Sequence, residues 1–319
     1  MSLPSSLSVS ETMKILVDRR PVLEPVLRAF EPVIEAFGRL AGELAGPLAE
    51  RGIAVPELDL EREAQGVSLL AGWDCAGIGD CLAQSAKGML PLLVKTEALK
   101  KSAGALEDFF AGKAASGEER DAREALAQAV LSGDDDAVVA VAEKAGIDAE
   151  VLKFAGEMCL SPVLRAMVDA CIKAHENKNP WDAGNRWQQG YCPVCGAFAT
   201  IAWLARPSQE DNPFLQAGGG RRHLHCGACG ADWLFKRIAC PSCGSEDKGS
   251  SNIFKQSGIS FGERIDWCDK CKTYLPTIDF RESEHVLDLD ALALGMMHLD
   301  MVAHDKQLKP LKVSFWNAL

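Results

Sequence analysis

The chain has no long apolar run and no recognisable leader. No stretch of eighteen or more apolar residues occurs among its 319 residues, so we expect no stable membrane insertion. The N-terminus, Met-Ser-Leu-Pro-Ser-Ser, has no basic segment followed by an apolar run, and we therefore expect no secretory signal. These absences predict a cytoplasmic protein. There, thiols stay reduced and paired cysteines bind metal more often than they form disulfides.

Basic side chains are fewer than acidic ones. The formal net charge is −11, and residues 1–189 hold 30 acidic and 20 basic side chains. Residues 190–280 are close to neutral, with 9 acidic and 10 basic side chains. A nucleic-acid-binding protein concentrates positive charge at its reading surface. The charge pattern therefore predicts no nucleic-acid partner and argues against a zinc-ribbon nucleic-acid binder.

The familiar catalytic motifs are missing as well. The sequence contains no Ser-His-Asp order, no phosphate loop and no dinucleotide fingerprint. We therefore assign no catalytic residue and no residue that binds an organic cofactor. The apolar fraction of 47% and the charged fraction of 25% are those of an ordinary soluble globular protein.

Cysteine is what the chain has in quantity. Eight of its twelve cysteines form four Cys-x-x-Cys pairs: Cys192/Cys195, Cys226/Cys229, Cys240/Cys243 and Cys268/Cys271. Two thiolates separated by two residues can hold one metal ion from a tight turn, and two such turns complete a tetrahedral site. The sequence therefore predicts two four-cysteine sites and two metal ions per chain.

An internal repeat indicates how the pairs combine. Cys192-Pro193-Val194-Cys195-Gly196 resembles Cys240-Pro241-Ser242-Cys243-Gly244, and corresponding cysteines lie 48 and 42 positions apart. The repeat favours one ion on the first two pairs and one on the last two. The alternative joins the two middle pairs, Cys226/Cys229 and Cys240/Cys243, and leaves the outer pairs together.

Cysteine spacing does not separate two kinds of metal. Four thiolates in such turns are typical of structural zinc, which replaces a core too small to hold itself together. The same Cys-Pro-x-Cys-Gly turns also serve rubredoxin-like iron, which would allow one-electron chemistry.

The pattern predicts an α+β fold. Residues 10–175 have helical periodicity and predict an all-α bundle of seven to nine helices, in which Ser161-Pro162 reads as a helix start. Six short strands are expected at 198–204, 222–225, 233–238, 252–256, 259–266 and 274–280. A mobile loop is expected at 207–222 and a helix at 286–305. We predict a helical domain over 1–180, a first four-cysteine rubredoxin-like module over 181–236, and a second with the C-terminal helix over 237–319.

The remaining cysteines and several histidines have simpler interpretations. Four cysteines are interpreted as packing residues of the core: Cys75, Cys81, Cys159 and Cys171. Four histidines are interpreted as surface residues: His223, His225, His298 and His304. Asp300 lies near the last two, on what we expect to be a solvated helix face.

Several segments carry a resemblance to a known family. They are Gly190-Tyr191-Cys192-Pro193-Val194-Cys195-Gly196, Arg222-His223-Leu224-His225-Cys226-Gly227-Ala228-Cys229 with Trp233, Arg237-Ile238-Ala239-Cys240-Pro241-Ser242-Cys243, and Glu263 with Cys268-Asp269-Lys270-Cys271 and Tyr274-Leu275. As an ordered set these motifs resemble the formate dehydrogenase accessory protein family, FdhE. The glycines of Cys226-Gly227-Ala228-Cys229-Gly230 depart from the bulkier residues expected in that turn.

The resemblance implies an assembly factor rather than an enzyme. Proteins of this family are cytoplasmic, are needed for active respiratory formate dehydrogenases, and contact the molybdenum- or tungsten-containing catalytic subunit before its export by the twin-arginine route. Their Cys-x-x-Cys motifs are associated with rubredoxin-like iron, which favours iron over zinc at the eight cysteines. A homodimer is compatible with the sequence. The alternative function is a rubredoxin-like redox protein that passes electrons to a partner or senses its redox state.

Overall fold

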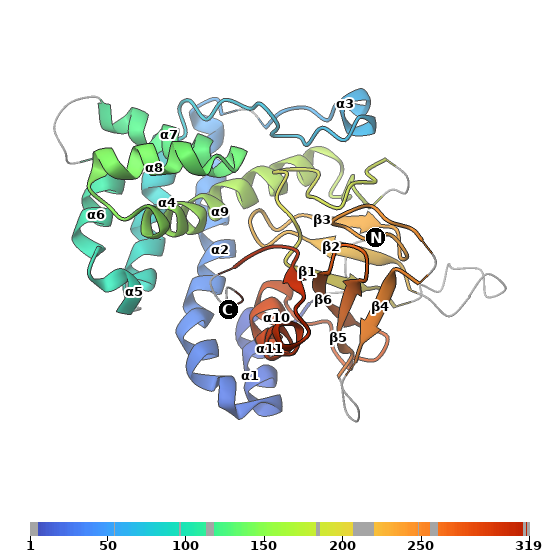
Figure 1. Ribbon diagram of the computed structural model, residues 1–319. Coiled ribbons are helices and arrows are strands. Elements are labelled where there is room, and N and C mark those ends of the chain that lie inside the picture. The colour runs from blue at the N-terminus through green and yellow to red at the C-terminus, as the bar shows by residue number, and fades with distance from the viewer. Residues whose placement is uncertain are drawn as a thin grey trace. The chain divides into compact units, whose positions relative to one another are not determined.

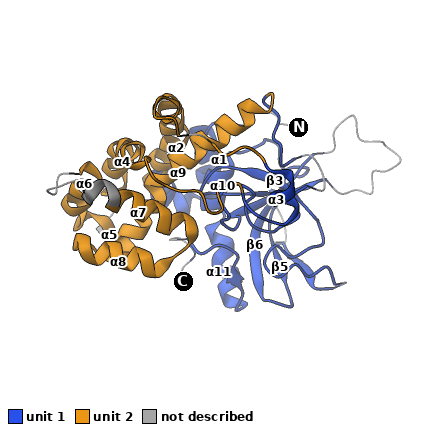
Figure 2. Cartoon of the chain, turned by 90° about the horizontal axis from the view of Figure 1, so that it is seen from above, with its two compact units in different colours: residues 1–28, 59–68, 177–319 blue, residues 29–58, 69–176 orange. Residues whose placement is uncertain are grey.

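The computed structural model describes residues 6–53, 55–95, 97–112, 118–182, 186–206, 220–247, 249–255, 261–314 and 317 (Figure 1). The chain divides into two compact units, coloured separately in Figure 2. The first unit comprises Met1–Arg28, Asp59–Ser68 and Asn177–Leu319. The second comprises Ala29–Leu58 and Leu69–Glu176. The domain boundaries predicted after residues 180 and 236 stay a prediction.

The helical interpretation of residues 10–175 is confirmed. The helices are α1 (Val9–Arg19), α2 (Glu24–Glu50), α3 (Leu60–Ala64), α4 (Gly79–Leu93), α5 (Glu97–Lys100), α6 (Ala103–Ala111), α7 (Glu118–Ser132), α8 (Asp135–Ala145) and α9 (Ala149–Ala174), with a short 3₁₀ turn at Pro21–Leu23. Asp134 and Asp148 cap α8 and α9 by accepting hydrogen bonds from backbone N–H groups of the first turn. Local sequence chemistry thus fixes where these two helices begin.

One predicted helix start is wrong. Ser161 and Pro162 lie inside α9, which runs unbroken from Ala149 to Ala174. Proline in a helix interior removes one backbone hydrogen bond and crowds the preceding turn. Both residues are nevertheless buried, as are most of the apolar residues of α9 around them. Burial of the helix therefore outweighs the local preference for a break.

The core of the second unit is built on α4 and α9. Helix α4 packs against α6, α7 and α9, and α8 packs against α7 and α9. Cys75, Cys81, Cys159 and Cys171 are all buried, as predicted for packing residues. Burial raises the pKa of Cys75 to about 12, and burial likewise raises the pKa of Cys159. The thiols of Cys75 and Cys159 therefore favour the protonated form, and neither belongs to a four-cysteine cluster among the described residues.

A single sheet joins the two cysteine modules in the first unit. Its strands are β1 (Ile201–Leu204), β2 (Arg222–His225), β3 (Asp232–Phe235), β4 (Ser251–Phe254), β5 (Glu263–Cys268), β6 (Thr273–Asp279) and β7 (Lys309–Pro310). The order is β3-β2-β1-β6-β5-β4, with β7 beside β6. Strands β1 and β6 pair in parallel, with Ala202 opposite Thr277, and this pairing connects one module to the other. The six expected strands are thus present, but in one sheet.

The first unit also contains helices, among them α1 and α3. Helix α1 packs against α10 (Leu289–Gly295), and α11 (Met297–Asp305) contacts β5 and β7. Gly295 lies at a close helix contact, because a Cβ atom there would come within 2.6 Å of a methyl group of Leu16. The helix expected over 286–305 is therefore present as two helices that meet at Met296.

The predicted fold class is confirmed: a helical N-terminal region precedes a sheet that holds two four-cysteine clusters, followed by C-terminal helices. Most of the loop expected at 207–222 lies outside the described residues. Within the described ranges, no helix combines the length and the apolar character needed to cross a bilayer.

Candidate metal centres

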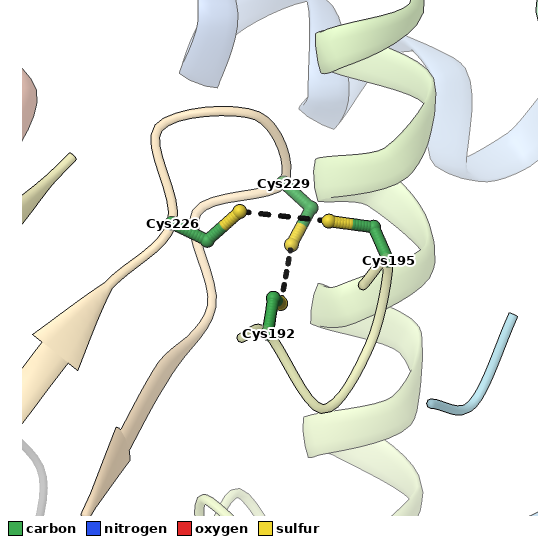
Figure 3. Close-up of side chains that lie close together, drawn as sticks. All are labelled: Cys192, Cys195, Cys226 and Cys229. Carbon is green, nitrogen blue, oxygen red and sulfur yellow. Dashed lines mark hydrogen bonds between the residues drawn. The ribbon is translucent and has the colours of Figure 1, made fainter. Parts of the chain in front are cut away.

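Four cysteines from two turns meet in the first cluster, defined as Cys192, Cys195, Cys226 and Cys229 (Figure 3). The Sγ atoms of Cys192 and Cys229 are 3.5 Å apart, and those of Cys195 and Cys226 are also 3.5 Å apart. All four side chains are buried. Figure 3 shows the sulfur atoms pointing toward one another from a turn on each side.

The two turns have the same backbone pattern. The N–H of Gly196 donates to the carbonyl of Cys192, and the N–H of Gly230 donates to that of Cys226. Both glycines have a positive φ, 80° and 72°, which suits a residue without Cβ. Gly227 is also required, because a Cβ there would lie 2.9 Å from Cγ2 of Thr200. The unexpected glycines of this turn thus fit its geometry.

The second cluster, defined as Cys240, Cys243, Cys268 and Cys271, repeats the arrangement with more exposure. The Sγ atoms of Cys240 and Cys271 are 3.6 Å apart, and those of Cys243 and Cys268 are 3.8 Å apart. Cys240 and Cys268 are buried, Cys271 is half-buried and Cys243 is exposed. Solvent and small molecules can therefore approach this cluster from the side of Cys243.

Both clusters fit a tetrahedral thiolate-bound ion. Metal–sulfur bonds of about 2.3 Å place the sulfurs of a tetrahedral site ~3.8 Å apart. In each cluster all four sulfur atoms lie within 4.8 Å of one another, and the closest pairs are 3.5–3.8 Å apart. The distances suit zinc and iron equally.

The thiols of the first cluster shift one another's pKa values. Burial raises the pKa of Cys192, and so do hydrogen bonds with the neighbouring cysteines. Hydrogen bonds from the other three cysteines lower the pKa of Cys226. Four buried thiolates cannot coexist at such distances unless a positive ion neutralises them.

The structure decides between the two groupings that the sequence left open. Each cluster takes its cysteines from within one module, and the middle pairs do not combine. The grouping favoured by the repeat is confirmed. Metal ligation by these eight cysteines stays a prediction.

A charged histidine lies beside the first cluster. His225 directly precedes Cys226, and its ring nitrogens are 3.1 Å from Asp232 and 3.3 Å from Asp290. Burial would lower the pKa of His225, but the two carboxylates outweigh it and raise that pKa to about 10. An imidazolium at this position adds positive charge next to a site that gathers thiolates.

The surface position expected for His223 and His225 is wrong. Both side chains are buried, because β2 is an inner strand of the sheet, between β1 and β3. His223 Nε2 is 2.7 Å from a carboxylate oxygen of Asp182, and its ring stacks on Trp203 at 4.0 Å. Sequence spacing correctly places both histidines on one strand face, but it contains no signal that identifies their acidic partners.

The solvated face expected for α11 is only partly correct. His304 is exposed, but Asp300 is buried and accepts a 2.7 Å hydrogen bond from the Tyr274 hydroxyl. Burial raises the pKa of Asp300 to about 6. Burial and the nearby Arg20 guanidinium lower the pKa of His298 to about 4. The side of α11 that carries these two side chains faces β5 and β6, and residue spacing alone does not reveal which side of the helix is buried.

Comparison with known proteins supports the resemblance read from the motifs. No family model matches the chain. A protein named FdhE homolog from Aquifex aeolicus is 30% identical over 162 residues, 50% of this chain and 50% of that protein. FdhE from Escherichia coli is 27% identical over 113 residues, 35% of this chain and 33% of that protein. The matched regions thus span half or less of the length of these curated relatives.

One solved structure is similar over nearly the whole chain. The crystal structure of the FdhE protein from Pseudomonas aeruginosa has a TM-score of 0.58 and 18% sequence identity, and the match covers 96% of this chain and 95% of that one. At that identity the likeness concerns the fold. The resemblance to FdhE proteins is confirmed, since two proteins with that name are 30% and 27% identical to part of the chain and a crystal structure with that name has a similar fold.

Proposed function

We propose that this chain is a cytoplasmic accessory factor for the maturation of respiratory formate dehydrogenase, and that it binds the catalytic subunit before export. The observation that carries the proposal is the pair of preassembled four-cysteine clusters in a chain similar to FdhE proteins. The role is that of a binding protein and not of an enzyme.

Eight residues hold one metal ion in each cluster: Cys192, Cys195, Cys226 and Cys229 in the first, and Cys240, Cys243, Cys268 and Cys271 in the second. A thiolate-bound ion cross-links two turns, and iron would add one-electron chemistry. The chain itself supplies the turn geometry, the buried setting of the first cluster and the His225 imidazolium beside it. We favour iron from the family resemblance, with zinc as the alternative.

The partner test uses a strain that lacks this protein and carries a tagged catalytic subunit of formate dehydrogenase. We expect the chain to co-purify with the subunit retained before export and to restore formate dehydrogenase activity. Normal activity in the deletion strain, together with no association, would refute the proposal.

The second candidate function is electron transfer or redox sensing, and the exposure of the second cluster favours it. Cys243 is exposed and Cys271 half-buried, so a partner can come close to an ion held there. Reversible bleaching of a visible charge-transfer band, in protein purified without oxygen, is the expected result. A colourless protein with stoichiometric zinc under those conditions would exclude this function.

A further inference from the structure

A cavity of about 290 Å³ opens beside the second cluster and is lined by three arginines. Arg222 comes from β2, Arg264 from β5, and Arg237 from the segment that follows β3. Asp266 is the carboxylate nearest to them. Several guanidinium groups around one small cavity form a fork suited to an oxyanion.

Arg222 is the buried member of the group. Its side chain is only 4% exposed, and one terminal nitrogen donates to the carbonyl of Ala239 at 3.1 Å. The other terminal nitrogen lies 3.7 Å from Asp266. Its Nε is buried and has no hydrogen-bond partner among the described residues. A buried guanidinium donor without an acceptor is costly, so Arg222, which lines the cavity, keeps one unused donor.

The positive charges exceed the carboxylate available to them. Arg264 makes two hydrogen bonds to Asp266 and lies 3.7 Å from Asp279, but Asp266 also serves Arg222 and Asp279 also pairs with Arg281. Arg237 donates to the carbonyl of Gly220 and forms no ion pair with a carboxylate in the described part of the chain. Burial lowers the pKa of Arg237, as does repulsion by Arg281 and Arg264. An anion in the cavity would relieve this repulsion.

The two other acidic residues that line the cavity already have cationic partners. Glu246 is 2.7 Å from the Nζ of Lys236, and Asp247 is 3.1 Å from that of Lys270. The rim also carries two apolar side chains, Ile238 and Ile253, with exposed fractions of 60% and 58%. The cavity therefore combines Arg237, which has no ion pair among the described residues, with an apolar edge.

We propose that this cavity binds a small organic anion, with a phosphate or carboxylate head against Arg222 and Arg237. The apolar part of the ligand contacts Ile238 and Ile253. The volume lies at the lower end of the range for small-molecule pockets and exceeds that of a bare oxyanion. Arg222 also donates to the carbonyl of Ala239, the residue before Cys240, and thereby connects the ligand site to the chain segment that leads into the second cluster.

Calorimetric titration of the full chain, at constant metal content, tests the proposal with phenyl phosphate, benzoate and inorganic phosphate. We expect phenyl phosphate or benzoate to bind more tightly than inorganic phosphate, and the better of the two identifies the head group. Arg237→Ala should weaken that binding by about tenfold, the usual effect of losing one charge-assisted hydrogen bond.

Lys255→Ala is the matched control. It removes one positive charge from a side chain that does not line the cavity, and its ion-pair partner Glu282 does not line the cavity either. Binding should be unchanged in this variant, and both variants should keep the wild-type circular dichroism spectrum. Absence of binding by the wild type at millimolar ligand overturns the proposal. Equal weakening by the two variants also overturns it, because it would reveal only general charge attraction.

Discussion

Two buried side chains of α11 have pKa values far from their ordinary ones. Asp300 and His298 lie two residues apart on α11 and are shifted in opposite senses, since burial favours the neutral form of both. The carboxyl group of Asp300 takes up a proton more readily in the folded protein, with a pKa of about 6 against an ordinary 3.8. The His298 ring takes one up less readily, with a pKa of about 4 against 6.5.

The first prediction concerns Asp300→Asn. The folded state binds a proton at Asp300 before the unfolded state does, so this residue makes the free energy of unfolding increase as the pH falls from 7 to 5. The variant should lose that increase and gain about 1 kcal/mol at pH 7, because asparagine still accepts the Tyr274 hydrogen bond. Denaturant unfolding of both proteins at each pH measures the difference.

His298→Gln provides the opposite case. The unfolded state protonates His298 first, so this residue lowers the free energy of unfolding as the pH falls from 7 to 5. The variant should therefore gain stability relative to the wild type on acidification. On acidification from pH 7 to 5, the free energy of unfolding relative to the wild type should fall for Asp300→Asn and rise for His298→Gln. If it changes in the same direction in both variants, the assignment of one pKa is wrong.

At the scale of elements, each pair of cysteines depends on a turn whose backbone is already folded for it. Gly196, Gly230 and Gly244 occupy corresponding positions with positive φ, whereas the fourth turn has Lys272 there with φ 58°. The N–H of Lys272 still donates to the carbonyl of Cys268, so the turn keeps its hydrogen bond. The backbone pattern, more than the residue type, defines these turns.

The second prediction tests the close approach at Gly227. Gly227→Ala places a Cβ 2.9 Å from Cγ2 of Thr200 and should lower the free energy of unfolding by about 1–2 kcal/mol. Thr200→Ser removes that methyl group, and in the double variant part of the loss should be regained. Thermal unfolding at fixed metal content gives the comparison. Additive losses would show that the two residues do not contact each other.

The third prediction concerns the ligands themselves. Cys240→Ser with Cys243→Ser should release one ion per chain and loosen the second cluster while sparing the helices of the second unit. Elemental analysis and circular dichroism measure both effects. Cys75→Ala is the control, because this buried thiol lies in neither cluster and its loss should leave the metal content intact. Unchanged metal in the double variant would refute the assignment.

At the scale of the whole molecule, the two clusters differ in access although they share one sheet. The first cluster is buried throughout, and the second has an exposed and a half-buried cysteine. The parallel pairing of β1 with β6 links the strands of the two cysteine modules. We therefore expect the loss of either cluster to weaken the sheet that both modules share. The helical unit has its own core.

The fourth prediction follows from this difference in access. A thiol-competing chelator should remove two ions per chain in two phases, with the fast phase from the second cluster. Metal release followed by a colorimetric indicator gives the rates, and Cys240→Ser with Cys243→Ser should lack the fast phase. A single phase for both ions would contradict the prediction.

The sequence pattern alone predicted the helices of residues 10–175, the six strands and the eight clustered cysteines, because these depend on periodicity and on short-range spacing. It misjudged residues whose surroundings come from distant parts of the chain. Pro162 lies within α9 because the helix is buried on both sides of it. His225 is buried because Asp232 and Asp290 meet it across the sheet and from α10.

The amino-acid sequence by itself determined which cysteines pair in each turn, since two residues of spacing bring two sulfurs together whatever surrounds them. The tertiary structure decided that both modules share one sheet, that one cluster is buried while the other reaches solvent, and that three arginines from separate segments surround one cavity. Burial and charge neighbours depend on long-range packing, which no local pattern encodes.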